Sequence, residues 1–209
     1  CQCSNGLFVC GTQCCAEGTY CAKGADTSTY TCAKPTSGCT KNSDCKDAEG
    51  NVDTSKYCHF SDSSCSGPTG GTCTDKGTLT PYTLNLPGGA LTVYKGGEMN
   101  WWSAVNFCKA HNKSLLSLAD LGITGGYDSG SCQGSDCTGA NWSDLQKKFG
   151  DAFGVNYWVT DALSCDEDYN CKAGSNNNSC EAFSMNLPSG SVNGNFGRHG
   201  SGDTFALCE

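Results

Sequence analysis

The sequence predicts a disulfide-stapled α+β protein in two parts, and three observations lead to that prediction. The chain of 209 residues contains 19 cysteines but only 16% charged residues. Twelve of the cysteines lie in residues 1–75, where aliphatic residues are few, so disulfides must supply much of the stability there. From about residue 78 the pattern changes to short apolar segments, which predict antiparallel strands and two short helices.

Composition and charge narrow the classes of protein and partner. This much cysteine predicts an oxidising compartment, and therefore a secreted protein or one on the extracellular cell surface. The net charge of −8 would repel phosphate backbones, which excludes nucleic acid as a partner. No apolar run is long enough to span a bilayer. Because the cysteine number is odd, three fates are open for Cys1: attachment of a lipid anchor, an internal disulfide, or a bond to another chain.

Residues 1–75 are expected to form a cysteine-rich module that is mostly irregular, with short strands and turns. It divides into two knottin- or EGF-sized subunits, CGTQCCAEGTYC with Cys32 and then the run from CTKNSDC to GTC, joined by KPTSG. Zinc is the alternative to disulfides, but adjacent cysteines at 14–15 and the lack of regular CxxC pairs argue against it. His59 is interpreted as a surface residue. The stretch 66–81, rich in Gly, Thr and Pro, is expected to be the linker.

The first elements after the linker are a strand pair and a helix. YTLNLPGGALTVYKG alternates apolar and polar residues around Pro87-Gly88-Gly89, which predicts two strands joined by a turn. Asn100 is a plausible helix cap, and apolar residues at helical spacing follow it as far as Cys108. Asn112 can take the left-handed conformation that ends such a helix. LLSLADLG is expected to be extended and buried.

The remaining elements are one helix and three strands. NWSDLQKKF (141–149) places Trp142, Leu145 and Phe149 on one helical face, with Gly150 as its stop. Three apolar segments are expected to be strands, namely VNYWVTDA, EAFSMNL and TFALCE.

Three of these segments carry a resemblance to a known family. WWSAVNFCKAHNKSLLSL resembles the first-helix signature of C-type lectin-like domains, W..A...C...G..L. YWVTDA resembles the W-I-G core strand of that family, and ALCE resembles its closing F-I-C-E. The resemblance implies a C-type lectin-like domain over residues 78–209, behind the module of residues 1–75. It also implies a structural disulfide between Cys108 on the first helix and Cys208 on the last strand.

The other cysteines of this part suggest local staples. Cys132 and Cys137 enclose QGSD, and Cys165 and Cys171 enclose DEDYN, so each pair is expected to close a short loop. Cys180 then has no local partner. It could form a disulfide in place of one of these four cysteines, or with a cysteine of residues 1–75. The connectivity is therefore open at this point.

Calcium is the one cofactor that the sequence suggests. The family's sugar motifs, E-P-N or Q-P-D followed by W-N-D, are missing. Instead Asp166, Asp168 and Asn170 offer oxygen ligands at alternate positions, which suits a hard cation. The match to a calcium-binding loop then fails, because Cys171 stands where glycine belongs and Asn177 where glutamate belongs. A solvated acidic loop pinned by a disulfide is the alternative interpretation.

Recognition is the best-supported activity. Residues 172–204 are rich in Asn, Ser and Gly, whose short polar side chains suit an adaptable binding surface. Programmed sequence diversity and an ordinary polar loop are alternative origins for this composition. The expected ligand-binding residues, for a glycan or protein on another cell or surface, are Asp161, Asp166, Asp168, Asn170, Asn193, Asn195, Arg198 and His199.

Catalysis is not expected, so the chain is interpreted as a non-enzyme. Its three histidines are far apart in sequence, and no GxSxG, HExxH or P-loop motif is present. The resulting prediction is an extracellular adhesin or lectin-like recognition protein. The alternative is a structural subunit of an extracellular filament, pilus or surface coat, since dense disulfides and few charges suit durable self-assembly as well.

Overall fold

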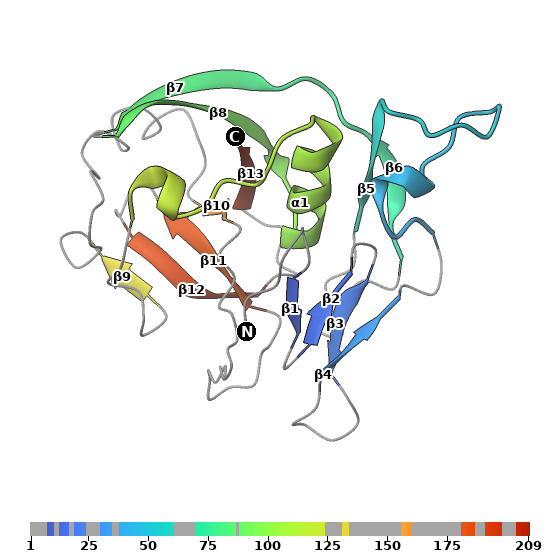
Figure 1. The fold of residues 1–209 in the computed structure, drawn as a ribbon, viewed down its shortest axis with the longest axis horizontal. Helices are drawn as coiled ribbons and strands as arrows, with labels where there is room; N and C mark the ends of the chain where they lie inside the picture. The colour runs from blue at the N-terminus through green and yellow to red at the C-terminus, as the bar shows by residue number, and fades with distance from the viewer. Residues whose placement is uncertain are drawn as a thin grey trace.

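The structure is a computed structural model that describes residues 8–10, 13–16, 19–23, 30–34, 38–60, 70–86, 88–123, 131–133, 156–159, 181–186, 191–197 and 204–209. Within these residues it is mostly β, with one α-helix, two 3₁₀ turns, a large mixed sheet and several disulfides. Figure 1 shows the large sheet and the helix on one side and the small N-terminal sheets on the other. No described helix has the length and apolar character needed to cross a membrane.

One seven-stranded sheet organises the second half of the chain. Its order is β7-β8-β13-β10-β11-β12-β9, so the last strand in sequence lies near the middle (Figure 1). Strand β13 runs antiparallel to β8 and parallel to β10, and the other pairs are antiparallel. The strands are β7 (Thr80–Leu86), β8 (Gly89–Glu98), β9 (Ser131–Gln133), β10 (Asn156–Trp158), β11 (Glu181–Asn186), β12 (Ser191–Gly197) and β13 (Thr204–Cys208).

The first two strands form the predicted hairpin. Strands β7 and β8 pair from Thr80 opposite Lys95 to Leu86 opposite Gly89. Gly89 has a φ of +128°, a backbone conformation that L side chains rarely adopt, so glycine is required at this turn. The alternation of the sequence carries Leu84 and Val93 inward, where both are buried.

Helix α1 (Trp101–Ala110) begins and ends where the sequence predicts. The Asn100 side chain accepts a hydrogen bond of 2.9 Å from the backbone N–H of Ser103, so it caps the helix. Asn112 has a φ of +58° and takes the left-handed conformation beyond the C-terminus. Cys108 on this helix is joined to Cys208 on β13, the pairing that the family resemblance implies.

The segment after the helix differs in part from its prediction. Leu115 forms an isolated bridge with Cys208, and Leu116 donates a backbone hydrogen bond to Leu207, so this part is extended and buried. Residues Ala119–Leu121 instead form a 3₁₀ turn, η2. The reason is local, because Asp120 accepts hydrogen bonds from the backbone and hydroxyl of Ser117 and favours a turn over a strand.

One hydrophobic cluster fills the space between the sheet and the Leu-rich segment. It contains the buried side chains Leu84, Val93, Leu116, Leu118, Leu121, Ile123, Tyr157, Val159, Met185, Val192 and Leu207. These residues come from six strands, with Val159 directly after β10, and from the segment after α1, so the core depends on elements that are distant in sequence. The second predicted helix, residues 141–149, lies outside the described residues.

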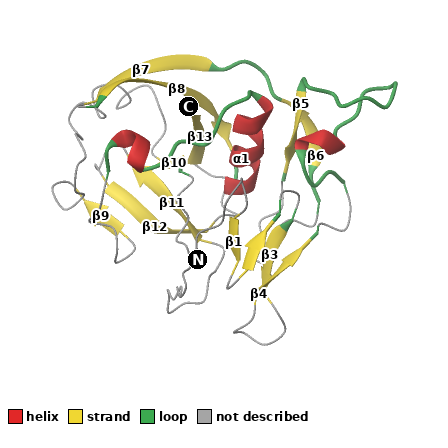
Figure 2. Cartoon of the chain, viewed as in Figure 1, coloured by secondary structure: helices red, strands yellow, loops and turns green. Residues whose placement is uncertain are grey.

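The N-terminal part consists of small hairpins, as predicted. Three two-stranded sheets pair β1 with β2, β3 with β4, and β5 with β6 (Figure 1). Figure 2 shows their short strands in yellow. Their strands are β1 (Phe8–Cys10), β2 (Gln13–Cys15), β3 (Tyr20–Lys23), β4 (Tyr30–Ala33), β5 (Lys56–His59) and β6 (Thr72–Asp75), with the 3₁₀ turn η1 (Asn42–Asp44) before β5. Disulfides staple these hairpins at Cys15–Cys32, Cys39–Cys58 and Cys45–Cys73.

The predicted linker of residues 66–81 is corrected by the structure. Strand β6 lies inside it and pairs with β5, with Cys58 directly opposite Cys73. Lys76, also in this stretch, donates a hydrogen bond of 2.8 Å to the carbonyl of Ala110 at the end of α1. The threonines of this stretch therefore belong to a short strand, which pairing with β5 and the Cys45–Cys73 disulfide hold in place.

Helix α1 covers the free edge of strand β5 with a ladder of polar side chains. Asn100, Ser103 and Asn106 are spaced three residues apart and lie on one face of the helix. Asn106 donates to the Cys58 carbonyl at 3.0 Å, Ser103 accepts from the Phe60 N–H at 2.8 Å, and Asn100 donates to the Phe60 carbonyl. The helix side chains thus replace a neighbouring strand, which satisfies backbone groups that would otherwise be buried without partners.

Residues on both sides of the 75/78 boundary share one hydrophobic cluster. Phe107 packs edge-on against Tyr57 with ring centroids 5.3 Å apart, so the helix contacts β5 directly. Asn42 of η1 strengthens this contact by donating to the Asn106 carbonyl at 2.7 Å and accepting from the Cys58 N–H at 2.9 Å. The fully or nearly buried members of the cluster are Cys39, Cys45, Tyr57, Cys58, Phe60, Met99, Trp101, Trp102, Ala104, Phe107, Cys108, Leu115, Trp158, Ala206 and Cys208.

Replacing Asn100 tests the ladder and the helix cap together. Asn100→Ala removes the cap of α1 and one of the two side-chain donors to the Phe60 carbonyl, to which the Ser103 hydroxyl still donates, so we expect a loss of about 1–3 kcal/mol in the free energy of unfolding, measured by urea denaturation. Asn100→Ser retains a capping oxygen but cannot reach the Phe60 carbonyl, so its free energy of unfolding should lie between those of Asn100→Ala and the wild type. Equal losses for the two variants would show that the cap contributes nothing.

Candidate functional site

The candidate recognition site is built on one end of the large sheet, where three neighbouring strands begin or end. Strand β10 runs toward Val159, β11 begins at Glu181 and β12 ends at Gly197, which lies opposite Glu181 in the antiparallel register. The segments 160–180 and 198–203 are attached to the sheet at these three points. The segments 160–180 and 198–203, which carry most of the predicted ligand-binding residues, are therefore anchored at one end of the sheet.

Two tryptophans fix the point at which β10 ends. Trp101 of helix α1 donates its indole N–H to the Val159 carbonyl at 2.9 Å. Trp158 of β10 donates its own indole N–H to the Met99 carbonyl at 2.7 Å, just before the helix. Both side chains are buried, so these reciprocal hydrogen bonds are shielded from water and hold the helix and strand in one relative position.

The structure corrects one part of the loop prediction. Asn193 and Asn195 lie in strand β12, which pairs with β11 on one side and with β9 on the other. The polar composition of this stretch predicts a loop, but pairing on both sides and burial of Val192 favour a strand. These two residues are therefore held on a sheet backbone, with Asn193 opposite Ser184.

The other predicted site residues lie outside the described residues. They are the ligand-binding candidates Asp161, Asp166, Asp168, Asn170, Arg198 and His199, which include the calcium ligands Asp166, Asp168 and Asn170. The predicted staple Cys165–Cys171 also lies outside, as does Cys137. Cys132 is in β9, opposite Val192, with only its backbone described.

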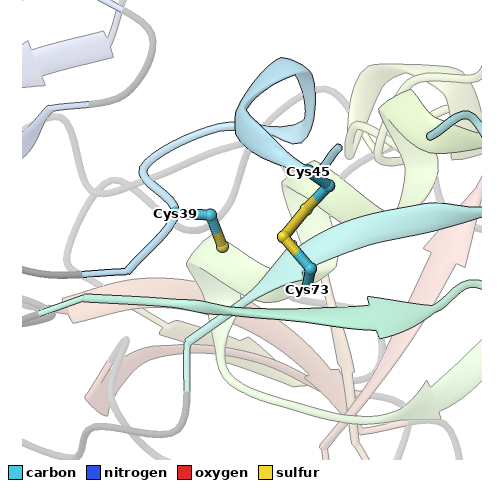
Figure 3. A group of neighbouring side chains, drawn as sticks. All are labelled: Cys39, Cys45 and Cys73. Carbon is cyan, nitrogen blue, oxygen red and sulfur yellow. A yellow bond between two sulfur atoms is a disulfide. The ribbon is translucent and has the colours of Figure 1, made fainter. Parts of the chain in front are cut away.

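A second group of functional side chains gathers in the N-terminal part. The sulfur atoms of Cys39, Cys45 and Cys73 all lie within 4.8 Å of one another (Figure 3). Such a cluster could hold a soft metal only as thiolates. Here the sulfurs are oxidised in two disulfides, Cys39–Cys58 and Cys45–Cys73, so the described cluster is a disulfide pair and not a metal site.

Gly71 allows the two disulfides to lie so close together. A Cβ atom added to Gly71 would lie 2.4 Å from the Cys58 sulfur and 2.8 Å from the Cys39 sulfur. Gly71 also pairs with Cys39 through two backbone hydrogen bonds, of 2.9 and 3.0 Å, so it cannot easily move away. No side chain larger than hydrogen fits this position without displacing the disulfide.

Substitution of Gly71 should therefore destabilise the N-terminal part. We expect Gly71→Ala to lower the free energy of unfolding by about 1–3 kcal/mol, the usual effect of overpacking a well-packed site, as measured by urea denaturation. Gly88→Ala is the matched control, because an added Cβ there meets nothing within 4 Å. An unchanged midpoint for Gly71→Ala would mean that the disulfide pair adjusts freely to the extra atom.

Two histidines lie near this cluster and are partly buried. His59, expected at the surface, is half-buried and its Nδ1 lies 3.1 Å from the Tyr57 hydroxyl. Burial lowers the pKa of His59, and burial also lowers the pKa of His111, whose Nε2 contacts the Lys76 carbonyl at 3.2 Å. Both imidazoles are therefore neutral near pH 7, and their described contacts are structural.

Sequence reasoning missed the strand β12, the tryptophan exchange and the disulfide pair. The alternation of SVNGNFG, with an apolar residue at 192 and another at 196, was the available signal for the strand. The other two features depend on the meeting of distant segments, for which a single sequence gives no signal. Comparison of the chain with protein-family models, curated proteins and solved structures found no match.

Proposed function

We propose that this protein is an extracellular recognition protein whose residues 78–209 form a C-type lectin-like domain. The observation that carries the proposal is the Cys108–Cys208 disulfide, which ties helix α1 to β13 between strands β8 and β10. Disulfides at every cysteine whose side chain is described are compatible with a secreted or cell-surface location. The module of residues 1–75 is the N-terminal partner of this domain.

In the proposed mechanism of recognition, a rigid end of the large sheet holds polar segments that contact the ligand. The sheet end at Val159, Glu181 and Gly197 is fixed by the hydrophobic core and by the two tryptophan hydrogen bonds. A fixed base lowers the entropy lost when attached residues bind a ligand. The residues attached there, Asp161, residues 166–170 and residues 198–199, offer carboxylates, amides and cations suited to sugar hydroxyls or to a polar protein surface.

A glycan array probed with the purified full chain tests this proposal. We expect binding to a small set of glycans, and we expect the double variant Arg198→Ala/His199→Ala to lose it. Lys46→Ala, which removes an exposed cation of the N-terminal part, is the matched control and should bind like the wild type. Loss of binding in both variants would point to a general charge effect and contradict the assignment.

The calcium site is tested in the same experiment. If Asp166, Asp168 and Asn170 hold calcium that orders the site, then a chelator should abolish binding and added calcium should restore it. The double variant Asp166→Asn/Asp168→Asn should then bind weakly even with calcium, whereas Glu49→Gln, at an exposed acid elsewhere, should not change. Binding that is insensitive to the chelator would remove calcium from the proposal.

Self-assembly is the outcome that would favour the alternative function. Non-reducing electrophoresis of native protein should give a single monomer band if the chain is an adhesin. A ladder of covalent multimers, together with no binding on the array, would instead support a subunit of a filament, pilus or surface coat.

A further inference from the structure

The two disulfides beside Gly71 are close enough to react with each other. The sulfurs of Cys39, Cys45 and Cys73 lie within 4.8 Å of one another, although Cys39 is bonded to Cys58 and Cys45 to Cys73. Thiol–disulfide exchange needs only the approach of a thiolate to a neighbouring disulfide sulfur. A thiolate released from one disulfide would therefore lie close to a sulfur of the other disulfide.

The strand register offers a second pairing of the same four sulfurs. Cys58 and Cys73 lie directly opposite each other in the antiparallel β5–β6 pair, yet each is bonded to a different cysteine. Directly opposed residues have Cα atoms about 4.5–5.5 Å apart, which is within the range of disulfides. The same four cysteines could therefore also pair as Cys58–Cys73 and Cys39–Cys45.

Burial selects which sulfur an external thiol can reach. Cys45 and Cys58 are 0% exposed and Cys39 is 5% exposed, whereas Cys73 is only partly buried. A low-molecular-weight thiol is therefore expected to attack the Cys73 sulfur first. That attack leaves Cys45 as a buried thiolate beside Cys39.

We propose that this cluster is a thiol-reactive site at which a small external thiol triggers exchange of the two disulfides. The external thiolate bonds to Cys73 and releases Cys45 as a thiolate. The Cys45 thiolate then bonds to Cys39 and releases Cys58, which attacks the mixed disulfide at Cys73 and releases the external thiol. The cycle forms Cys39–Cys45 and Cys58–Cys73, consumes no electrons and regenerates the thiolate.

The exchange has a structural consequence for the contact with helix α1. In the observed pairing, disulfides tie both ends of residues 39–45 to strands β5 and β6. After exchange, Cys39–Cys45 closes a loop on itself and Cys58–Cys73 staples only the hairpin. Asn42, which links Cys58 to Asn106 of the helix, would then lose its covalent connection to β5.

Pulsed labelling of the full, oxidised chain tests the proposal. The protein is incubated with reduced glutathione without oxygen and pulsed with iodoacetamide, and the labelled cysteines are mapped by mass spectrometry after cleavage at Lys41, Lys46 and Phe60. We expect glutathione on Cys73, label on Cys45 first, and label on Cys58 afterwards despite its complete burial. Peptides linked by Cys39–Cys45 or Cys58–Cys73 would add direct support.

The double variant Cys45→Ala/Cys73→Ala removes the first step of the relay. Labelling of Cys58 should then be slower by roughly tenfold or more, because the Cys39–Cys58 bond has no neighbouring thiolate to open it. Any loss of stability in this variant would speed labelling, so slower labelling is a stringent result. The proposal is overturned if Cys58 is labelled equally fast in the variant, or if the wild type shows glutathione on Cys39 or Cys58 before Cys45 is labelled.

If the double variant does not fold, the wild-type order of labelling decides alone. Label on Cys45 before Cys58 supports the relay. Label that stops at Cys45, with Cys39–Cys58 intact, contradicts it.

Discussion

Removing the disulfide between the helix and the last strand should cost more stability than removing any of the small N-terminal staples. We expect Cys108→Ala/Cys208→Ala to lower the free energy of unfolding by about 4–5 kcal/mol, because this bond closes a loop of 100 residues. Both cysteines are fully buried and the cluster around them is intact, so the alanines leave little strain. The measurement is the urea midpoint of the purified chain under oxidising conditions.

A shorter disulfide provides the control for loop length. Cys39→Ala/Cys58→Ala opens a loop of 19 residues, and the same chain-entropy argument gives a loss of about 3 kcal/mol. The two double variants should therefore differ by roughly 1–2 kcal/mol, with the long loop losing more. A larger loss for the short loop would mean that packing of the sulfurs, and not loop closure, dominates the contribution of these bonds.

Truncating Trp158 should have the second large effect. This side chain is fully buried between helix α1 and the sheet and donates to the Met99 carbonyl. We expect Trp158→Ala to destabilise the fold by about 3–5 kcal/mol, since it leaves a large cavity and an unpaired carbonyl. Urea denaturation followed by the far-ultraviolet circular dichroism signal measures this loss.

Phenylalanine separates the two causes at this position. Trp158→Phe retains most of the apolar volume but removes the indole donor, so its loss should be nearer 1–3 kcal/mol. If the recognition proposal is correct, both variants should also weaken glycan binding, because β10 leads directly into the segment 160–180. Equal destabilisation by Phe and Ala would show that the hydrogen bond, and not the volume, holds this strand.

Local signals explain most of what could be predicted of the fold. The Asn100 cap, the left-handed Asn112 and the hairpin that pairs Leu86 with Gly89 each depend on a few neighbouring residues, and each appears as expected. Segment 66–81 and strand β12 were misjudged because their Gly and Asn residues have weak strand propensity in isolation. In the structure β6 pairs with β5, and β12 pairs with β11 on one side and with the more distant β9 on the other, which overrides that propensity.

The site was less predictable than the fold for a related reason. The residue types indicated polar recognition. The sheet end to which these residues are attached, however, is held by hydrogen bonds from Trp101 to Val159 and from Trp158 to Met99, each between residues about sixty positions apart in sequence. The cysteine pattern likewise indicated disulfides without indicating which sulfurs would be neighbours. Only the family resemblance gave a long-range pairing, Cys108 with Cys208, and the structure contains it.

The position of β13 in the sheet has a consequence for biosynthesis. Strands β8 and β10 are hydrogen-bonded only through β13, which the ribosome makes after every other described strand. Until residues 204–208 emerge, no backbone hydrogen bonds join the β7–β8 hairpin to the four strands β10, β11, β12 and β9, and Cys108 cannot meet its partner. Completion of the sheet should therefore wait for β13, with a period in which Cys108 is open to wrong partners. Correct oxidation of this chain would then depend on a disulfide isomerase more than its small size suggests.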